Sequence, residues 1–274
     1  MLGYYPGCTV RAQQDDGFEG QALAILQAAG LVVEELSEWE CCGAVYPQTS
    51  DEYTPLLSSV RALKRTQEEN KEGLLTLCSA CYHVLKRVNN RMNNDLAAKE
   101  RVENYLQTQY DGGTKVYHLI EVLRDQVGLA KLKEMVIAPL HGEKIACYYG
   151  CLFLRPQREM GLLDAENPQL MEEILTCLGA EAVYYPYRTD CCGAYLGVKQ
   201  EDISNSASLK LIAAAQQAGA TRMVTACPLC KFNLETCQGK SKEADRLPIS
   251  YITDPLYRAL GLDKGIGKPR RLAK

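Results

Sequence analysis

The sequence has little excess charge and no long apolar run. Its 274 residues include 31 basic and 34 acidic side chains, a formal net charge of −3. This balance argues against a nucleic-acid-binding protein, because such proteins usually carry a basic stripe. No apolar run reaches the roughly 18 residues of a membrane span. The N-terminal MLGYYPGC shows no charged or apolar leader region, so we expect no signal peptide and a cytoplasmic, reducing location.

Several signatures of common enzymes are also missing. We find no Walker loop and no GxSxG element, and the GIG of the C-terminal tail lacks the strand, third glycine and helix of a dinucleotide site. The compact C-x2-C-x2-C-x3-C-P run of a ferredoxin is absent too. If the protein is a reductase, its electrons must therefore arrive from another subunit.

Cysteine, by contrast, is abundant, with 13 residues. Disulfides are rare in a reducing cytosol, where clustered cysteines more often bind metal or take part in redox chemistry. An odd number also fits a complete disulfide framework poorly.

Ten of these cysteines form an internal repeat. YPGC, ECCGA and CSAC in the first half recur in the same order as YYGC, DCCGA and CPLC in the second. Each half thus carries one cysteine, then an adjacent pair, then C-x-x-C. The first set is Cys8, Cys41, Cys42, Cys78 and Cys81, and the second is Cys151, Cys191, Cys192, Cys227 and Cys230. The segments KVYHLIEVLRDQVGL and PISYITDPLYRALGL close the two halves in a similar way.

Hydrophobic periodicity predicts strands that alternate with helices in both halves. We expect strands at 1–5, 31–36, 73–77, 145–149, 182–185 and 223–226, and helices at 18–29, 55–70, from 82 onward, 168–178 and 203–218. Such alternation indicates an α/β fold with a small parallel sheet and flanking helices in each half. Because every cysteine motif follows a predicted strand, the five cysteines of a half can converge at the carboxyl edge of one sheet.

Three interpretations of these thiols remain open at this point. Free cysteines can be small buried hydrophobes, but that would not produce a repeated pattern. A structural zinc ion uses four ligands, which the CC and C-x-x-C elements could supply. An iron–sulfur cluster is also held by cysteine thiolates, and adjacent cysteines can reach two irons of a cluster more easily than one tetrahedral ion.

The duplicated C…CCG…C-x-x-C pattern resembles the cysteine-rich CCG domain. With YPGC, CSACYHVLKRVN and YGCLFLRP, nearly the whole chain is similar to the B subunit of heterodisulfide reductase. The resemblance implies two Rossmann-like halves related by a pseudo-twofold axis. It also implies two noncubane [4Fe-4S] clusters, each on one of the five-cysteine sets.

The resemblance further implies an enzyme, a disulfide oxidoreductase that acts as a subunit of a complex. The family reduces the mixed disulfide of coenzymes M and B between its two clusters, with no acid–base residue beyond the cysteines. A ferredoxin-like two-cluster subunit, fed by a flavoprotein, would deliver the electrons. The alternative is a CCG subunit that only relays electrons in a quinone-linked or dehydrogenase complex. A zinc-stabilised scaffold without redox activity is a third hypothesis. The disulfide substrate itself does not follow from the sequence.

The remaining candidates have structural alternatives. We favour Cys151 over Cys147 as a ligand, and expect Cys177 to pack in the core and Cys237 to be a surface thiol. Arg155 and Lys231 could contact an anionic substrate or simply lie on the surface. His83 could donate a hydrogen bond to a cluster sulfur, but an ordinary helix position is the preferred interpretation, and His118 and His141 are treated as structural.

We expect a first half over 1–138, a second half over 139–262 and a basic tail over 263–274. The carboxyl edges of the two sheets are expected to face a shared cleft.

Overall fold

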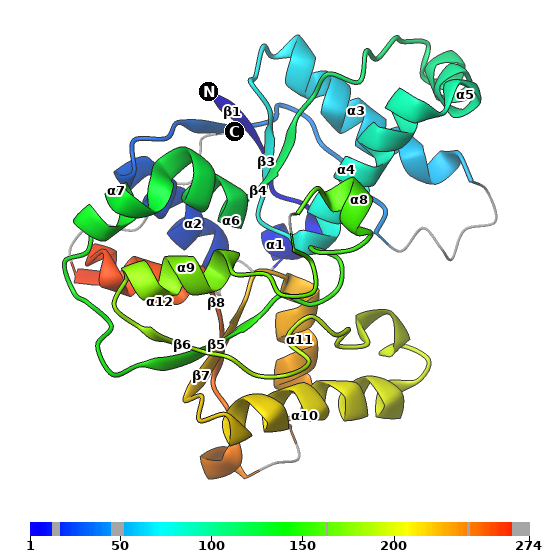
Figure 1. Ribbon diagram of the computed structural model, residues 1–274. Helices are drawn as coiled ribbons and strands as arrows, with labels where there is room; N and C mark the ends of the chain where they lie inside the picture. The colour runs from blue at the N-terminus through cyan, green and yellow to red at the C-terminus, as the bar shows by residue number, and fades with distance from the viewer. Residues whose placement is uncertain (13–16, 45–51, 163, 240–241, 265–274) are drawn as a thin grey trace.

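A computed structural model describes residues 1–264 except 13–16, 45–51, 163 and 240–241. It contains two parallel sheets of four strands with equivalent strand orders, β2-β1-β3-β4 and β6-β5-β7-β8 (Figure 1). The strands are β1 (Leu2–Tyr5), β2 (Val33–Glu35), β3 (Leu74–Thr76), β4 (Val116–His118), β5 (Lys144–Tyr148), β6 (Glu181–Val183), β7 (Arg222–Thr225) and β8 (Ile249–Tyr251). The predicted α/β fold of two repeated halves is confirmed.

Helices flank both sheets. In the first half they are α1 (Cys8–Ala12), α2 (Phe18–Ala28), α3 (Thr54–Glu68), α4 (Ser79–Asn94), α5 (Leu96–Leu106), α6 (Leu119–Glu121) and α7 (Leu129–Glu134). In the second half they are α8 (Gln157–Met160), α9 (Leu170–Cys177), α10 (Glu201–Gln217), α11 (Pro228–Thr236) and α12 (Thr253–Ala259). None of these described helices is both long and apolar enough to span a membrane.

The predicted elements agree with the structure to within two residues at each end, apart from α4, which begins at Ser79 rather than Tyr82. The number of strands per half was wrong: each sheet has a fourth strand, β4 or β8, within the closing segments of the two halves. Each of these strands has only three residues, too few for a period-2 pattern to separate it from the helix that follows. They extend both sheets beyond the strand that precedes C-x-x-C.

The two halves share one hydrophobic core. Phe18 at the start of α2 stacks on Tyr251 of β8, with ring centroids 3.8 Å apart. Helix α12 of the second half packs against α2, and α9 packs against α7. A second, smaller core, which includes Met223 and Leu234, belongs to the second half alone. The halves are therefore joined by packing across their boundary, and this packing fixes how the two sheets meet.

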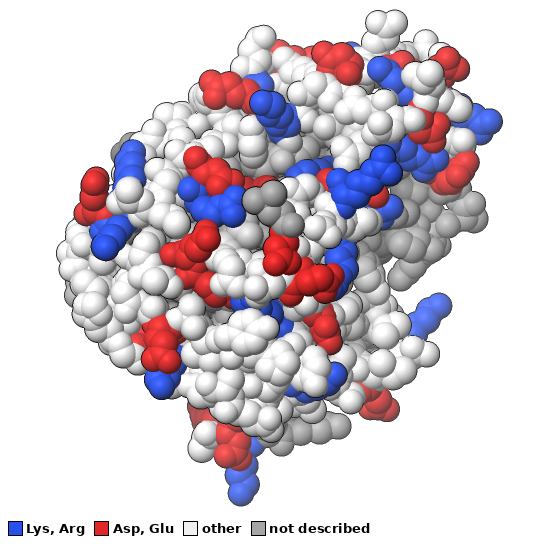
Figure 2. Space-filling view, in the orientation of Figure 1, with Lys and Arg blue, Asp and Glu red and all other residues white. Residues whose placement is uncertain are grey.

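Acidic and basic side chains are interspersed on the face shown in Figure 2. This agrees with the nearly balanced charge of the sequence. Of the expected basic tail over 263–274, residues 265–274 lie outside the described part of the chain.

Candidate metal centre

The cysteine motifs lie where parallel strands end and helices begin. Cys8 follows β1 and is the first residue of α1. Cys78 follows β3 and is the N-cap of α4, and Cys227 follows β7 and is the N-cap of α11. A helix N-terminus favours negative charge, so it favours the thiolate form that binds metal.

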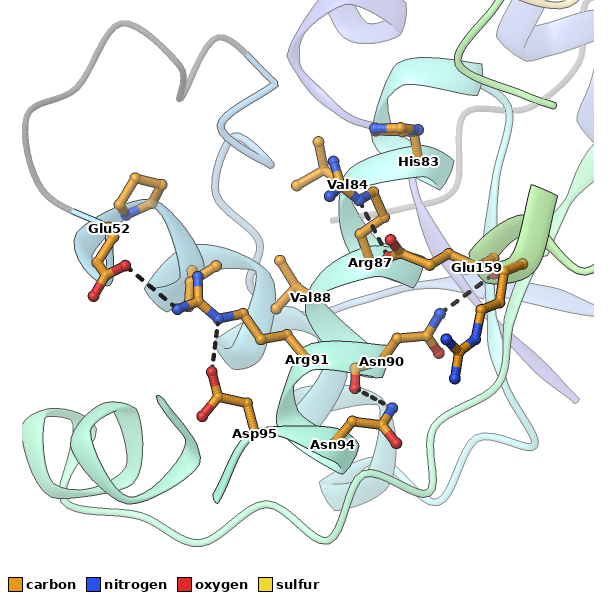
Figure 3. Close-up of a pocket in the computed structure, with 13 residues that line it drawn as sticks. Glu52, His83, Val84, Arg87, Val88, Asn90, Arg91, Asn94, Asp95 and Glu159 are labelled. Carbon is orange, nitrogen blue, oxygen red and sulfur yellow. Dashed lines mark hydrogen bonds and ion pairs between the residues drawn. The ribbon is translucent and has the colours of Figure 1, made fainter. Parts of the chain in front are cut away.

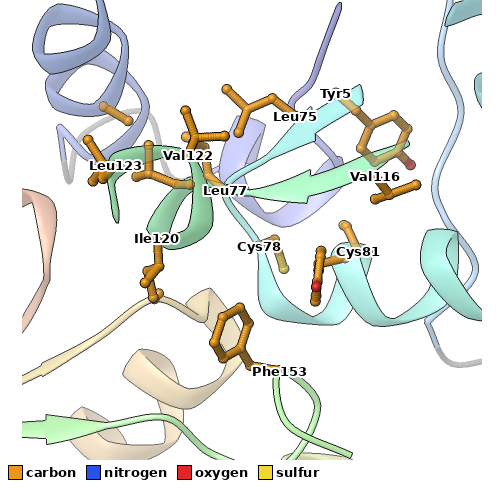
Figure 4. Close-up of a cluster of buried hydrophobic side chains, with 14 of the residues drawn as sticks. Tyr5, Leu75, Leu77, Cys78, Cys81, Val116, Ile120, Val122, Leu123 and Phe153 are labelled. Carbon is orange, nitrogen blue, oxygen red and sulfur yellow. The ribbon is translucent and has the colours of Figure 1, made fainter. Parts of the chain in front are cut away.

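In the first half the five thiols lie one beside the next in space. The Sγ atoms of Cys8 and Cys41 are 3.5 Å apart, and those of Cys42 and Cys81 are 3.4 Å apart. The thiols of Cys41 and Cys42, and those of Cys78 and Cys81, also lie close enough to shift each other's pKa. Cys78 and Cys81 both lie at the N-terminal end of α4 (Figure 4), where Phe153 of the second half packs against Tyr82 of the same helix.

The second half repeats this arrangement. Cys192 and Cys230 have their Sγ atoms 3.6 Å apart. All five cysteines of this half line one small cavity, and neighbouring thiols shift each other's pKa: Cys151 and Cys191, Cys191 and Cys192, and Cys227 and Cys230. The structure therefore brings together all five predicted cysteines of each half.

The two sets meet at Cys78 and Cys227, whose thiols lie close enough across the boundary between the halves to shift each other's pKa. Beside them, the Ser79 hydroxyl donates to the Ala226 carbonyl at 3.2 Å. The ten sulfurs form one continuous series that is symmetric about Cys78 and Cys227. Its order is Cys8, Cys41, Cys42, Cys81, Cys78, Cys227, Cys230, Cys192, Cys191 and Cys151. The carboxyl edges of the two sheets thus face each other, as expected.

Some thiols of the series favour the thiolate form and others keep their proton. The pKa is lowered at Cys42, Cys78 and Cys191, whereas it is raised at Cys227, Cys230 and Cys192, which follow one another in the series. Hydrogen bonds from Cys41 and Cys81 lower the pKa of Cys42 to about 4. Those from Cys151 and Cys192 lower the pKa of Cys191 to about 2. Each thiolate is held by the protons of its neighbours. A metal that replaces those protons would meet ligands already gathered in place.

Two glycines allow the sulfurs to approach the backbone. Gly7 has φ +73°, and a Cβ at this position would lie 2.7 Å from the Cys81 sulfur. Gly150 has φ +67°, and its Cβ would lie 3.2 Å from the Cys230 sulfur. Glycine is therefore required in both YxGC motifs, for its backbone conformation and for space.

Buried tyrosines hold the loops that carry the adjacent cysteines. The Tyr5 hydroxyl donates to the Glu40 carbonyl at 2.5 Å, and the Tyr148 hydroxyl donates to the Asp190 carbonyl at 2.7 Å. These carbonyls directly precede Cys41 and Cys191. Neither tyrosine was predicted from the sequence, although a tyrosine three positions before the first cysteine of each half was a visible signal.

Buried polar contacts give the second half further support. Glu172 of α9 accepts a hydrogen bond from Tyr149 at 2.5 Å and forms a buried ion pair with Arg188. Arg155, a candidate for substrate contact, instead donates to the Thr189 carbonyl at 3.0 Å and pairs with Glu166 at 2.8 Å. These contacts fix the backbone just before Cys191.

Two further candidates do not face the sulfurs. His83 Nδ1 lies 3.1 Å from the Leu152 carbonyl, across the boundary between the halves. Lys231 pairs with Glu235 at 2.8 Å and lies over the Tyr251 ring.

Three cysteines lie outside the series of ten. Cys147 is fully buried in β5 beside Glu172, and burial raises the pKa of its thiol. Cys177 ends α9, packs partly against the core, and donates to the Ile174 carbonyl. The prediction of a surface thiol at Cys237 was wrong. It caps α11, is only 7% exposed, and packs in the smaller core because the helix turns it inward.

A small cavity adjoins the thiols. Its volume is about 20 Å³, and its lining includes the five cysteines of the second set and the ring of Tyr195. A larger cavity of about 640 Å³ runs along the outer face of α4, between α3 and α8 (Figure 3). Two of its three arginines already face carboxylates, with Arg87 on Glu159 and Arg91 on Asp95. We therefore place the metal chemistry at the smaller cavity.

The donors of both sets are cysteines alone. Four thiols can hold a structural zinc ion, and thiols also hold iron–sulfur clusters. Each half brings five thiols together, one more than a structural zinc ion takes, which favours a cluster whose several irons take separate thiolates.

Comparison with known proteins agrees with the repeat. The model of the cysteine-rich domain family CCG matches residues 2–86 and again 145–235. The chain belongs to the CCG family. It carries the CCG domain twice, in the positions of the two sulfur sets, so the predicted family resemblance is confirmed.

Relatives match over almost the entire length. The chain is 31% identical, over 95% of its length and 92% of the relative, to the 8-methylmenaquinol:fumarate reductase membrane anchor subunit of Wolinella succinogenes. It is 30% identical, over 95% of its length and 89% of the relative, to the B subunit of the ferredoxin/F(420)H(2)-dependent CoB-CoM heterodisulfide reductase of Methanosarcina acetivorans. A Helicobacter pylori hypothetical protein of known structure shares the fold at TM-score 0.72 and 12% identity, covering 96% of this chain and 51% of that one.

Proposed function

We propose that this CCG protein is the iron–sulfur subunit of a multi-subunit oxidoreductase and that it reduces a disulfide substrate. Each five-cysteine set would hold one noncubane [4Fe-4S] cluster. The proposed ligands are Cys8, Cys41, Cys42, Cys78 and Cys81 for the first cluster, and Cys151, Cys191, Cys192, Cys227 and Cys230 for the second.

The observation that carries this proposal is the approach of Cys78 to Cys227 at the centre of the series, where the hydrogen bond from Ser79 to the Ala226 carbonyl joins the two C-x-x-C motifs. Cleavage of a disulfide takes two electrons and leaves two sulfurs to be stabilised. Two metal sites that face each other across one boundary match this requirement. When bound, each cluster would supply one electron and an iron that accepts one of the two sulfurs.

The chain's own residues would position this chemistry and shield it from water. The N-termini of α4 and α11 carry Cys78 and Cys227, and the neighbouring thiols of Cys227 and Cys81 hold the pKa of Cys78 well below its usual value. Tyr5 and Tyr148 hold the backbone before the adjacent cysteine pairs. Cys192 and Cys227 are each only 2% exposed, so the inner part of the second site is dry.

The electron donor would be a separate ferredoxin-like two-cluster subunit, itself fed by a flavoprotein. Two observations support this: the chain has no ferredoxin-type cysteine run, and relatives such as the Methanosarcina acetivorans protein are named for ferredoxin-dependent complexes. The substrate would be a disulfide of the CoM-S-S-CoB type or a related thiol compound.

A second function is favoured by one specific observation. The Wolinella succinogenes relative, at 31% identity, is named as a subunit of an 8-methylmenaquinol:fumarate reductase. By this analogy the two clusters would relay electrons within a quinone-linked complex. The two functions differ in what reacts at the cysteine site, a disulfide in the first and no substrate in the second.

Metal analysis of the anaerobically purified protein tests both functions against a zinc scaffold. Two sets of five cysteines should bind about eight irons with acid-labile sulfide, about four in each cluster. Two zinc ions without sulfide would contradict both redox functions. Addition of a small thiol to the oxidised protein then separates them: altered EPR signals would indicate catalysis, and unchanged signals would indicate relay.

A further inference from the structure

Tyr195 lies at the mouth of the sulfur site. It follows Cys191, Cys192, Gly193 and Ala194, and Gly193 turns the chain with φ +79° into a short 3-10 helix over Ala194–Leu196. This turn places the tyrosine ring in the lining of the small cavity, together with the five thiols of its own half. Neither family membership nor the cysteine repeat explains why a tyrosine stands here.

The ring separates buried sulfurs from solvent. Tyr195 is 39% exposed, whereas Cys192 and Cys227 are 2% exposed and Cys230 is 7% exposed. Burial raises the pKa of the Tyr195 hydroxyl, and the nearby sulfurs of Cys151 and Cys227 raise it further. The outer edge of the side chain thus faces water, and its inner edge faces the thiols.

The hydroxyl joins the two halves. It donates a hydrogen bond to the Ala44 carbonyl at 2.9 Å. Ala44 belongs to the CCGA motif of the first half, and Tyr195 follows the CCGA motif of the second. The side chain therefore extends from one cysteine loop to the other across the site. At the matching place in the first half the sequence has Val45, whose side chain has no hydroxyl.

The cavity beside Tyr195 is too small for a substrate. About 20 Å³ is close to the space for a single water molecule. A disulfide or thiol compound cannot enter until a side chain moves. Tyr195 lines the cavity, is partly exposed and has a bulky ring. Its hydroxyl is held by one hydrogen bond, to the Ala44 carbonyl, so the side chain can move when that bond breaks.

We propose that Tyr195 controls access to the sulfur site and contacts the substrate. In the closed state its hydroxyl is bound to Ala44. An incoming sulfur compound displaces the ring and takes the hydrogen bond of the hydroxyl in place of the Ala44 carbonyl. This inference rests on the proposed disulfide reduction and assigns a residue outside the cysteine ligands to the recognition of its substrate.

Time-resolved alkylation of the anaerobically purified protein with iodoacetamide, followed by peptide mapping, tests the inference. Peptide mapping reports the labelling of each cysteine, so the two halves are followed separately. A cysteine that holds metal is labelled only after the metal leaves. In Tyr195→Ala, we expect Cys192, Cys227 and Cys230 to be labelled several-fold faster than in the wild type, and in Tyr195→Phe to a smaller extent. Cys8 and Cys41 should keep their wild-type rates.

Tyr187→Phe is the matched control, because Tyr187 has a similar exposure of 40% in the same half. Wild-type labelling rates in both Tyr195 variants would overturn the inference, as would equal acceleration in both halves, which would indicate general loosening. In turnover assays with a disulfide, Tyr195→Phe should change KM more than kcat. Iron and sulfide analysis of the wild type tests the proposed function separately, so the two can fail independently.

Discussion

The hydroxyl of Ser79 donates a hydrogen bond to the carbonyl of Ala226 at 3.2 Å. Ser79 follows Cys78 in the first half, and Ala226 precedes Cys227 in the second. On its other side, Ser79 lies 3.4 Å from Nε2 of His118. Burial lowers the pKa of His118 to about 3, so the ring is neutral, and the Ile120 amide donates to its Nδ1. Nε2 therefore carries the proton that faces Ser79. Through the bond from Ser79 to the Ala226 carbonyl, the first half positions the backbone just before the C-x-x-C motif of the second half.

Ser79→Ala should weaken this connection. The Ala226 carbonyl would lose a buried partner, which costs about 1–3 kcal/mol of the free energy of unfolding. A lower midpoint of anaerobic thermal unfolding would measure it. Ser206→Ala, at an exposed position of α10, is the control and should leave the midpoint unchanged. An equal midpoint for both variants would show that Ser79 does not bridge the halves.

Cys192→Ser should remove the second metal site and leave the first. The serine hydroxyl keeps the size of the side chain but does not supply a soft thiolate, so iron should fall to about half of the wild-type content. Disulfide reduction should be lost, because it needs both sites, and the second half should become more sensitive to protease. Cys177→Ser is the control, since Cys177 lies outside the sulfur series on α9 and should leave iron and activity unchanged. Full iron content in Cys192→Ser would contradict the assignment of the second site.

The sequence was sufficient to predict which cysteines gather, for a reason that lies in strand geometry. Cys8, Cys42 and Cys78 each follow a parallel strand, and the ends of such strands meet at one sheet edge. The repeat then extended the same argument to the second half. Spacing alone could not give the approach of Cys78 to Cys227, because the orientation of the sheets depends on packing such as that of Phe18 on Tyr251.

Other features depend on contacts that no local pattern encodes. Strands β4 and β8 are three residues long and carry no periodic signal. Cys237 lies in a polar stretch of sequence, but the last turn of α11 directs it into the smaller core. Tyr195 is an ordinary surface residue in the sequence and becomes notable only because Ala44 of the other half lies beside it.

Tyr148→Phe should weaken metal binding in the second half. The variant keeps the buried ring and loses the hydrogen bond to the Asp190 carbonyl, which fixes the backbone before Cys191. A loss of about 1.4 kcal/mol corresponds to a tenfold weaker site. Titration with an iron chelator should release about half of the iron at lower chelator concentration than in the wild type. Tyr105→Phe, on the exposed surface of α5, should release iron as the wild type does.

Gly7→Ala should destroy the first metal site, and Gly142→Ala provides a closely matched control. Both glycines have positive φ, +73° and +83°, so both substitutions carry a similar backbone cost of about 1–2 kcal/mol. They differ in surroundings: a Cβ at Gly7 would lie 2.7 Å from the Cys81 sulfur, whereas a Cβ at Gly142 would meet nothing within 4 Å. We therefore expect Gly7→Ala to bind about half of the wild-type iron, with the first set of cysteines open to alkylation, and Gly142→Ala to bind the full amount. If both variants lost iron equally, backbone strain and not the approach of Cys81 would explain the glycine in the YxGC motif.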